Sequence, residues 1–325
     1  MQVIIPLAGK GTRLRPHTHL VPKPMLKVAG RPVMDYVMDR LEGLNVSELI
    51  FITGHLKEQV EAYARSRYKY PSRFIEQKVQ DGTAGAVNLA RPFVKEPVLI
   101  IFVDTVFEAD LTLINRTGAD GIIWAKEVED YQRFGVVVTD KDGYMTKIVE
   151  KPSTPISKLA NIGLYYIKDT AALWAGIDHT LAAPANKGEY YLTDAFQHMI
   201  EHGRKILTAE VGGWYDCGKL DTLLESNEIL LKHGGARRRE FPGVTIHDPV
   251  YIEDGVVIES SEIGPNVTLE AGTRVRNSRI EHAMVGQGCV IADSAVHHSL
   301  LGNRVQLKGV KGAMTLGDDC EVVGG

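Results

Sequence analysis

A glycine-rich stretch follows a short apolar run at the start of the chain, and it constrains the fold more than any other feature. The apolar run, residues 2–8, predicts a buried strand, and Gly9 and Gly11 follow it two residues apart. Arg13 comes next, and Lys23 stands between two prolines ten residues further on. Backbone N–H groups can approach phosphate oxygens where no Cβ intervenes, and fixed cations neutralise the phosphate charge. This order of features predicts a strand that feeds a polyphosphate-binding loop.

Two common phosphate-binding motifs do not fit this loop. The P-loop requires Gly-x-x-x-x-Gly-Lys-Ser/Thr, and no glycine stands at the required offset before the Gly9-Lys10 pair. The dinucleotide fingerprint Gly-x-Gly-x-x-Gly/Ala starts at Gly9, but Leu14 occupies its sixth position. A P-loop enzyme and a Rossmann dehydrogenase are therefore both disfavoured.

Composition restricts the partners and the compartment. The net charge of −4 over 325 residues gives no reason to expect nucleic acid or an anionic membrane as a partner. The three cysteines include no Cys-x-x-Cys pair, which argues against a zinc site and suits a reducing cytosol. The N-terminus lacks the layout of a signal peptide, and the longest apolar run, residues 98–103, is too short to span a bilayer. We therefore expect a cytoplasmic protein.

Strands and helices alternate over most of the chain. Apolar runs predict strands over residues 48–53 and 98–103, and four more strands follow closely between residues 120 and 167, with a hairpin turn at 140–143. Helical spacing predicts helices over residues 32–44, 57–68, 83–93, 170–181, 191–203 and 219–233. This alternation predicts an α/β fold, with a Rossmann-like mixed, mostly parallel sheet covered by helices.

The pattern changes after residue 243. Aliphatic residues recur at steps of five or six from Ile263 to Leu307, with small polar residues between them. Such repeats predict a parallel β-helix of the hexapeptide type, whose coils stack their aliphatic residues on one another. We therefore expect a first domain over residues 1–233, a linker over 234–243 and a β-helix domain over 244–325. The arginines of the linker are interpreted as a solvated face rather than a binding patch.

The order Leu-Ala-Gly-x-Gly-Thr-Arg-Leu-x-Pro at residues 7–16, followed by Pro-Lys-Pro at 22–24, resembles the signature of sugar-1-phosphate nucleotidyltransferases, also called nucleotide-sugar pyrophosphorylases. The segment after residue 243 looks like the left-handed β-helix tail of many such enzymes. The resemblance implies transfer of a nucleotidyl group from an NTP to a sugar 1-phosphate, giving an NDP-sugar and pyrophosphate by in-line attack at the α-phosphorus. Catalysis then consists of positioning and charge stabilisation, with Mg²⁺ as the implied cofactor.

The resemblance assigns the loop to the triphosphate. It implies nucleotide contacts from Leu7, Ala8, Gly9, Gly11 and Thr12. Arg13 matches the family arginine that stabilises the leaving β- and γ-phosphates, for which a planar fork is well suited. Lys23 matches the family lysine that reaches the α-phosphate and the sugar phosphate. Three further cations nearby are interpreted as surface charges: Lys10, Arg15 and Lys27.

A glutamine is the candidate base reader. Gln77 lies five residues before Gly82, the offset of the base-contacting glutamine of the family, and Gly82 and Thr83 are expected to complete the nucleotide contacts. An amide can pair with N3–H and O4 of a pyrimidine or with N1–H and O6 of guanine, so the base stays open. Gln80 is a local competitor, but its offset does not match.

Two aspartates are the candidate metal ligands. Asp104 follows an apolar run, so its side chain should emerge at the carboxyl end of a sheet strand, where open α/β sheets bind ligands. Asp216 lies in Trp-Tyr-Asp-Cys-Gly, which resembles the Trp-x-Asp-x-Gly of the family. The resemblance implies that both hold Mg²⁺ against the phosphates, although either alone could be a loop cap. Val103 stands where the family usually has glycine, which leaves the sugar in doubt.

The sugar side is assigned by resemblance to four residues. Glu150 matches a family residue that holds sugar hydroxyls, and Lys151 matches one that binds the sugar phosphate. The other two are Gly135, in Phe-Gly-Val-Val, and Asn161, in Asn-Ile-Gly-Leu-Tyr. The segment 188–194 also resembles a family segment, and its residues could be ligands or the local caps of a helix.

Several functions stay open. Glucose 1-phosphate with dTTP or UTP is the preferred substrate pair, and mannose 1-phosphate with GTP comes next. A catalytically silent subunit that senses sugar nucleotides is the alternative of another class. His297 and His298 in the β-helix could serve an acetyltransferase or be a surface pair. We expect a homo-oligomer that binds an NTP and a sugar 1-phosphate, with neither nucleic acid nor a membrane as partner.

Overall fold

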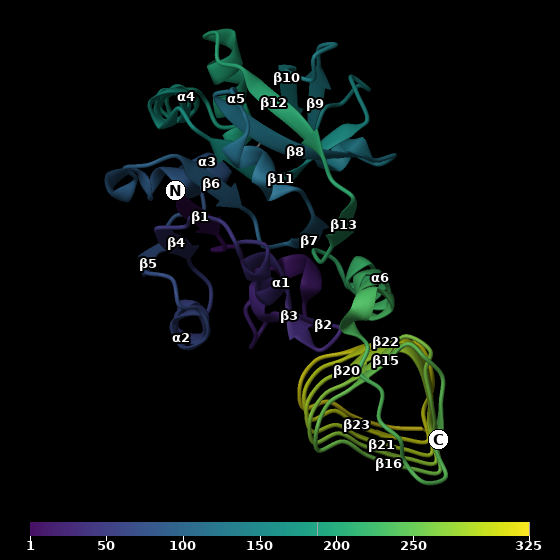
Figure 1. Cartoon of the computed structure of the whole chain (residues 1–325). Helices are drawn as coiled ribbons and strands as arrows, with labels where there is room; N and C mark the ends of the chain where they lie inside the picture. Colours follow the sequence, from purple (N-terminus) through teal and green to yellow (C-terminus); the bar gives the residue numbers. More distant parts are fainter. Residues whose placement is uncertain (187, 325) are drawn as a thin grey trace. The chain divides into compact units, whose positions relative to one another are not determined.

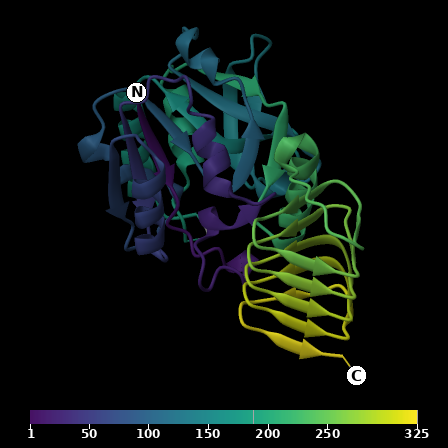
Figure 2. The ribbon, with the colours of Figure 1, turned by 60° about the horizontal axis from the view of Figure 1, so that its bottom comes forward.

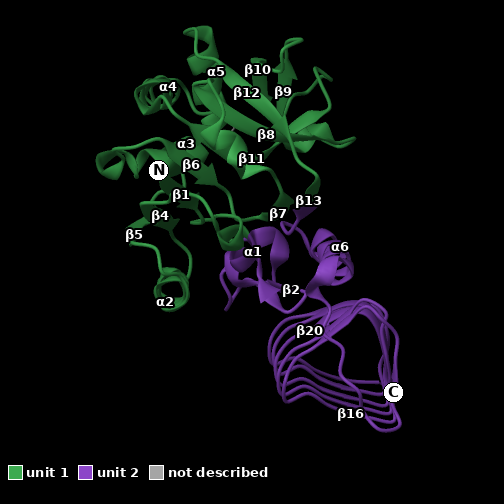
Figure 3. Cartoon of the chain, viewed as in Figure 1, with its two compact units in different colours: residues 1–10, 37–214 green, residues 11–36, 215–325 purple. Residues whose placement is uncertain are grey.

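The computed structural model describes residues 1–186 and 188–324. The chain divides into two compact units, residues 1–10 with 37–214 and residues 11–36 with 215–325 (Figure 3). Most of the glycine loop thus belongs to the same unit as the C-terminal segment. The boundaries at residues 233 and 244 stay a prediction, and Gly325, the end of the predicted β-helix domain, lies outside the described residues.

The first unit is built on a nine-stranded sheet, in which β1, Gln2–Pro6, is an interior strand (Figure 1). This strand pairs in parallel with β4, Glu48–Thr53, and with β6, Val98–Ile101, and β4 pairs in parallel with β5, Ser72–Glu76. Every residue of β1 is buried. A strand that is covered on both faces has a continuous apolar sequence, and this pattern is the one that predicts β1.

The other half of the sheet is largely antiparallel. Strand β11, Leu159–Ile167, lies antiparallel to β6 and to β8, Gly121–Glu127, and β12, Ile206–Glu210, runs parallel to β8. Strands β9, Gly135–Thr139, and β10, Met145–Glu150, form a hairpin at the predicted turn. The strand order β10-β9-β11-β6-β1-β4-β5 confirms the predicted mixed sheet.

Helices share one apolar core with this sheet. Side chains of α3, Thr83–Asn88, of α4, Thr170–Ala182, and of α5, Leu192–Glu201, pack against residues of β1, β4 and β6. Further elements are α1, Val33–Asp39, α2, Lys57–Arg67, β7, Thr105–Glu108, β13, Gly213–Asp216, and the 3₁₀ helices η3, Arg91–Phe93, η4, Leu111–Asn115, and η5, Tyr131–Arg133. The helix predicted over 83–93 is wrong in its second half, because α3 ends at Asn88 and a separate turn containing Pro92 follows.

The C-terminal segment winds into a parallel β-helix, and Figure 2 shows its coils stacked on one another. One face is a five-stranded sheet in the order β16-β19-β21-β23-β26, so the coil has five turns. Aliphatic side chains, among them Ile258, Val275, Ile291 and Leu307, fill its interior. The predicted stacking of one aliphatic residue on the next is therefore confirmed. The strands are β14 Thr245–Ile246, β15 Val250–Ile252, β16 Val257–Glu259, β17 Glu262–Ile263, β18 Val267–Leu269, β19 Arg274–Arg276, β20 Arg279–Val285, β21 Val290–Ala292, β22 Ala295–Leu301, β23 Gln306–Lys308, β24 Lys311–Gly312, β25 Thr315–Leu316 and β26 Glu321–Val323.

The remainder of the second unit is the loop segment 11–36 and helix α6, Leu220–Leu230. The loop segment holds the 3₁₀ helices η1, Thr12–Leu14, and η2, Lys23–Met25, and the short strands β2, Lys27–Val28, and β3, Arg31–Pro32. A π-helical turn, η6, Leu231–Gly235, follows α6.

The linker arginines at 237–239 are partly exposed and pair with Asp254, Glu240 and Asp248, which agrees with a solvated face. Among the helices that the structure describes, none is long and apolar enough to span a membrane.

Candidate active site

The glycine loop begins in the first unit, at the end of β1. Leu7 N donates a hydrogen bond to Ile52 O over 2.9 Å, which continues the pairing with β4. Ala8 is buried, and its carbonyl oxygen accepts a hydrogen bond from Gln80 Nε2 over 2.8 Å, whereas Gly9 is exposed. The predicted nucleotide contacts at residues 7–9 therefore lie at the carboxyl edge of the sheet.

The rest of the loop lies in the second unit. Gly11 has a left-handed φ of 62°, and Thr18 Oγ1 donates a hydrogen bond to its carbonyl oxygen over 2.8 Å. A Cβ at Gly11 would lie 3.2 Å from the Cβ of Lys23, so glycine lets the two halves of the loop approach closely. Thr12 begins η1, which carries the exposed Arg13. The predicted residues Gly11 and Lys23 are thus neighbours.

Asp216 and Arg13 border the same glycine of the second unit. Asp216 Oδ1 accepts a hydrogen bond from Gly218 N over 2.8 Å, and Ser226 Oγ donates to the carbonyl of Asp216 over 2.9 Å. A Cβ at Gly218 would lie 2.8 Å from Asp216 Oδ1 and 3.6 Å from Arg13 Nη2. The fold therefore brings a predicted metal ligand close to a predicted phosphate-binding cation from far away in the sequence.

The predicted base reader lies in the first unit, just after β5. Gln77 is 8% exposed, and its Nε2 donates hydrogen bonds to Asp81 Oδ1 over 3.0 Å and to Gly82 O over 3.3 Å. Gly82 has a φ of 116°, and a Cβ there would lie 2.4 Å from Tyr190 O. Thr83 Oγ1 accepts a hydrogen bond from the first N–H of α5 over 2.9 Å. The amide donors of Gln77 are thus engaged within the chain, so pairing with a base requires its carbonyl oxygen or an exchange of these bonds.

Three of the predicted sugar contacts meet around Gly135. Asn161 Nδ2 donates a hydrogen bond to Gly135 O over 2.7 Å. A Cβ at Gly135 would lie 2.2 Å from Asn161 Nδ2 and 2.9 Å from Glu150 Oε2. Thr193 Oγ1 donates a hydrogen bond to Glu150 Oε2 over 3.1 Å. We name Gly135, Glu150, Asn161 and Thr193 the Gly135 cluster, and it presents a carboxylate, an amide and a hydroxyl in one place.

Lys151 adds a cation beside this cluster. Its Nζ lies 3.6 Å from Glu150 Oε1, 3.4 Å from Tyr191 OH and 4.7 Å from the centroid of the Tyr191 ring. Burial raises the pKa of Glu150, although Lys151 and Thr193 oppose that shift. Burial likewise raises the pKa of Asp194, one residue after Thr193. The carboxylates at this place are thus costly to ionise unless a ligand donates hydrogen bonds to them.

Asp104 follows β6 in the first unit, and its charge acts on Tyr165. Burial, followed by the charges of Glu150 and Asp104, raises the pKa of Tyr165 well above its ordinary value. The hydroxyl of Tyr165 donates a hydrogen bond to Asn161 Oδ1. Val103, in place of the family glycine, is 5% exposed. Its side chain is therefore largely buried.

The two predicted magnesium ligands, Asp104 and Asp216, belong to different units. Residues 1–186 and 188–324 contain no group of three or more His, Cys, Asp or Glu side chains that could hold a metal ion. A cage made of protein ligands alone is therefore not available in the described chain. Mg²⁺ commonly binds one or two carboxylates together with substrate phosphates, and Asp104 and Asp216 are chemically suited to that mode.

The sequence does not single out Tyr165 or Tyr191. Tyr165 lies four residues after Asn161 on β11, but the strand is irregular between them, so regular alternation does not indicate that the two side chains meet. The segment 188–194 raises the choice between helix caps and ligands. The N-cap of α5 is Tyr191, without a side-chain cap hydrogen bond, and Thr193 instead reaches Glu150. The cap interpretation is therefore wrong for Thr193.

The interpretation of Lys27 as a surface charge is also wrong. Lys10 and Arg15 are exposed, but the side chain of Lys27 is 22% exposed and pairs with Glu270 and Glu253 of the β-helix. The two carboxylates that attract this cation lie far along the chain, so no local sequence pattern indicates the ion pairs.

The two histidines of the β-helix match the surface interpretation. His297 and His298 are exposed on β22. The ring of His298 stacks on that of His282 with centroids 4.8 Å apart, and His282 Nδ1 lies 2.7 Å from Glu228 Oε1.

Comparison with known proteins decides the family. The family model described as Nucleotidyl transferase matches residues 2–233, which include the glycine loop, the Gly135 cluster and both aspartates. The chain belongs to the nucleotidyl transferase family. This nucleotidyltransferase is therefore a transferase of the sugar-phosphate class, as its motifs predict.

Relatives of the nucleotidyltransferase carry several names. The bifunctional protein GlmU of Methanococcus aeolicus is 33% identical over 327 residues, which cover 94% of this chain and 77% of the relative. A glucose-1-phosphate thymidylyltransferase of Streptomyces griseus is 28% identical over 330 residues, which cover 96% of this chain and 90% of the relative. A crystal structure of UDP-glucose pyrophosphorylase complexed with UDP-glucose aligns with a TM-score of 0.64 at 23% identity, over 71% of this chain and 98% of that one. The last likeness confirms the α/β fold.

Proposed function

We propose that this nucleotidyltransferase transfers a nucleotidyl group from dTTP or UTP to glucose 1-phosphate. The observation that carries the proposal is the Gly135 cluster with Lys151 beside it. Carboxylate and amide groups suit the hydroxyls of a sugar, and an ammonium suits its phosphate. The thymidylyltransferase of Streptomyces griseus supports the choice of glucose 1-phosphate and dTTP.

The proposed reaction is a single in-line displacement. An oxygen of the sugar phosphate forms a bond to the α-phosphorus, while the bond from that phosphorus to the bridging oxygen of the β-phosphate breaks. Pyrophosphate leaves with the electron pair, and the nucleotide sugar remains. The step needs no proton transfer from the protein, so catalysis rests on orientation and charge.

In this reaction the predicted site residues divide between the phosphates, the base, the sugar and the metal ion. Lys23 neutralises the α-phosphate and the attacking sugar phosphate, and Arg13 holds the leaving β- and γ-phosphates. Gln77 contacts the base, and Glu150 and Asn161 orient the sugar. Asp104 and Asp216 would hold Mg²⁺, which supplies further neutralisation of phosphate charge when bound.

A panel of four NTPs against several sugar 1-phosphates tests the proposal. With Mg²⁺ present, the highest kcat/KM for pyrophosphate release is expected with glucose 1-phosphate and dTTP or UTP. The amide of Gln77 could also pair with guanine, so mannose 1-phosphate with GTP is the second candidate. A preference for that pair would replace the proposed substrates but keep the reaction. If no pair of substrates gives pyrophosphate, the alternative of a silent, ligand-sensing subunit is favoured. Membership of a transferase family argues against that alternative.

The remaining expectations stay proposals. We propose a cytoplasmic homo-oligomer with neither nucleic acid nor a membrane as partner. The mass of the full chain by light scattering tests the oligomer, and a mass equal to the 35.8 kDa of one chain would contradict it.

A further inference from the structure

The loop segment 11–36 has little regular structure of its own. Its elements are two 3₁₀ helices of three residues and two strands of two residues, apart from the first turn of α1. Fixing the backbone of each residue costs about 1–2 kcal/mol of conformational entropy at 25 °C. Contacts outside the segment must therefore hold Arg13 and Lys23 in place.

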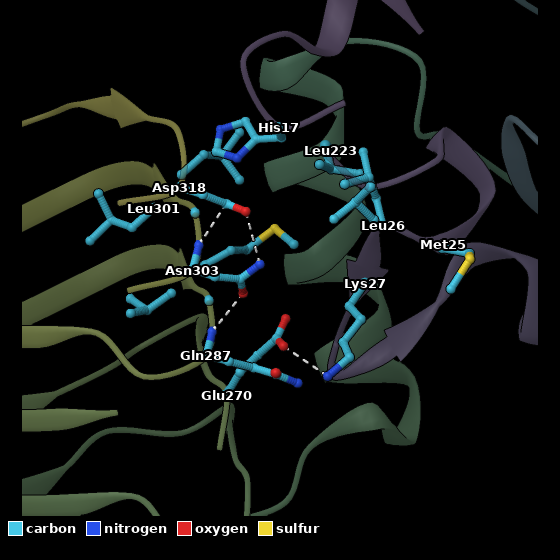
Figure 4. Close-up of a pocket in the computed structure, with 16 residues that line it drawn as sticks. His17, Met25, Leu26, Lys27, Leu223, Glu270, Gln287, Leu301, Asn303 and Asp318 are labelled. Carbon is cyan, nitrogen blue, oxygen red and sulfur yellow. Dashed lines mark hydrogen bonds and ion pairs between the residues drawn. The ribbon is translucent and has the colours of Figure 1, made fainter. Parts of the chain in front are cut away.

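Lys27 supplies the first such contact. Its Nζ lies 2.8 Å from Glu270 Oε2 and 3.6 Å from Glu253 Oε2, and the three side chains are 22%, 15% and 25% exposed (Figure 4 shows the pair with Glu270). Burial alone would lower the pKa of Lys27, but the two carboxylates raise it above its ordinary value. Burial raises the pKa of Glu270, although Lys27 opposes that shift. Removal of the lysine would thus leave a buried carboxylate without its cation.

Asn227 of helix α6 supplies the second contact. Its Oδ1 accepts a hydrogen bond from Ala29 N of the loop over 2.9 Å and another from Thr268 Oγ1 of the β-helix over 2.7 Å. Asn227 is 0% exposed, and Thr268 is 1% exposed. One buried amide oxygen therefore ties the loop and the β-helix to the same helix, in surroundings that strengthen both hydrogen bonds.

Gly30 supplies the third contact. Its φ is 77°, and a Cβ at this position would lie 2.2 Å from the ring of Tyr251 on β15. Only glycine lets the loop approach the β-helix so closely. The three contacts fall on residues 27, 29 and 30, within seven residues of Lys23.

Packing between the loop and the β-helix is not continuous. A cavity of about 240 Å³ lies beside the contacts, lined by loop residues such as His17, Met25 and Leu26 and by turns of the β-helix at residues 284–287 and 300–303 (Figure 4). Beside this pocket, the loop is held against the β-helix by the polar contacts of Lys27 and Ala29 and by the close approach at Gly30.

We propose that Lys27 and Asn227 are positioning residues through which the β-helix holds the loop that carries Arg13 and Lys23. The proposal rests on the proposed function, because it assigns the β-helix a part in nucleotidyl transfer. It gives the tail a role in catalysis without any residue of the tail touching the substrate.

The first test is Lys27→Met in the full chain. Displacement of Lys23 by a fraction of an ångström is expected to lower kcat for pyrophosphate release about tenfold or more. KM for the sugar 1-phosphate should rise by a smaller factor than kcat falls, because Lys23 is only one of its proposed contacts and the Gly135 cluster lies in the other unit. The charge-reversed variant Lys27→Glu/Glu270→Lys restores the ion pair and should recover most of the lost kcat.

A control variant separates the effect of the Lys27 contact from the loss of any ion pair in the second unit. Arg304→Met removes an ion pair to Asp319 between neighbouring coils of the β-helix, where both side chains are more than half exposed. Exposed pairs of this kind contribute about 0–1 kcal/mol, so its kcat should equal that of the wild type. A kcat of Lys27→Met equal to that of Arg304→Met, or failure of the reversed pair to recover activity, overturns the proposal.

Thr268→Val is the second test of the proposal, and it is used if Lys27→Met does not fold. It removes one hydrogen bond to Asn227 Oδ1 and nearly preserves volume, and its kcat is expected to fall by a larger factor than KM rises. An unchanged kcat in Thr268→Val would overturn the role of Asn227. Wild-type activity is measured first: an inactive wild type contradicts the function, whereas an active wild type with unaffected variants contradicts only the positioning.

Discussion

Asn161 Nδ2 donates a hydrogen bond to the carbonyl oxygen of Gly135 over 2.7 Å, which joins β11 to β9 through a side chain. The contact needs the space that glycine leaves, because a Cβ at this position would lie 2.2 Å from the same nitrogen. The geometry of the proposed sugar site thus depends on the absence of a side chain at residue 135.

Gly135→Ala should therefore disrupt the Gly135 cluster. Overpacking of a buried position costs about 1–3 kcal/mol, so the Tm should fall by several degrees. KM for the sugar 1-phosphate should rise more than KM for the NTP, because Asn161 and Glu150 are displaced. Gly118→Ala is the control, since a Cβ there has no neighbour within 4 Å. Equal changes in KM for the sugar 1-phosphate and KM for the NTP would show that the Gly135 cluster does not bind the sugar.

Arg13→Ala should lower turnover more than substrate affinity. Loss of a charge-stabilising donor costs about 10²–10³ in kcat when the group acts on charge that develops in the transition state. Steady-state kinetics with both substrates measures this, with the exposed Arg15→Ala as control. If KM for the sugar 1-phosphate rises and kcat is retained, Arg13 acts on the ground state and its role must be reassigned.

Asp104→Asn should remove most of the turnover while the fold stays intact. A neutral amide is a weaker ligand for Mg²⁺ than a carboxylate, so the concentration of Mg²⁺ needed for half-maximal activity should also rise. Circular dichroism checks the fold, and Asp142→Asn in the exposed hairpin turn is the control. Near-normal turnover at low Mg²⁺ would show that Asp104 is not a metal ligand.

Glu150→Gln should stabilise the protein at neutral pH. Burial raises the folded-state pKa of Glu150 above the ordinary 4.5, so the native state binds this proton more tightly than the unfolded chain. The stabilising contribution is present below the unfolded pKa and is lost as pH rises through the folded pKa. The variant cannot ionise, so its Tm should exceed that of the wild type at pH 7 and approach it as pH falls toward 4.5.

Glu129→Gln is the control for this pH dependence, because its side chain is 88% exposed and paired only with Lys158 in the described ion pairs. Its Tm should follow that of the wild type at every pH. A Glu150→Gln variant that is less stable than the wild type at neutral pH would mean that contacts of the carboxylate outweigh its burial.

Buried strands and repeats are the parts of this fold that the sequence predicts best. Strand β4, Glu48–Thr53, is predicted to the residue, because its four apolar residues, 49–52, stand between the polar residues Glu48 and Thr53. Strand β5 is not predicted, since Ser72, Arg73 and Glu76 interrupt its apolar pattern at the edge of the sheet. The β-helix is found because the same aliphatic spacing returns in every coil.

The local motifs find most of the candidate site, but not what supports it. Glu150 and Asn161 stand out because each lies in a short recognisable segment, and the fold brings both to Gly135. The pairing of Lys27 with Glu270 joins residues 243 positions apart, and nothing near either residue indicates it. A contact of this kind follows from the packing of the loop on the β-helix, which no local pattern encodes.

The most direct measurement is pyrophosphate release by the wild-type chain from glucose 1-phosphate and dTTP or UTP. With Mg²⁺ present, one pyrophosphate should appear for each nucleotide sugar formed, and EDTA should abolish both products. Release that requires no sugar 1-phosphate, or no release with any sugar 1-phosphate and NTP, would contradict the assignment of this chain as a sugar-1-phosphate nucleotidyltransferase.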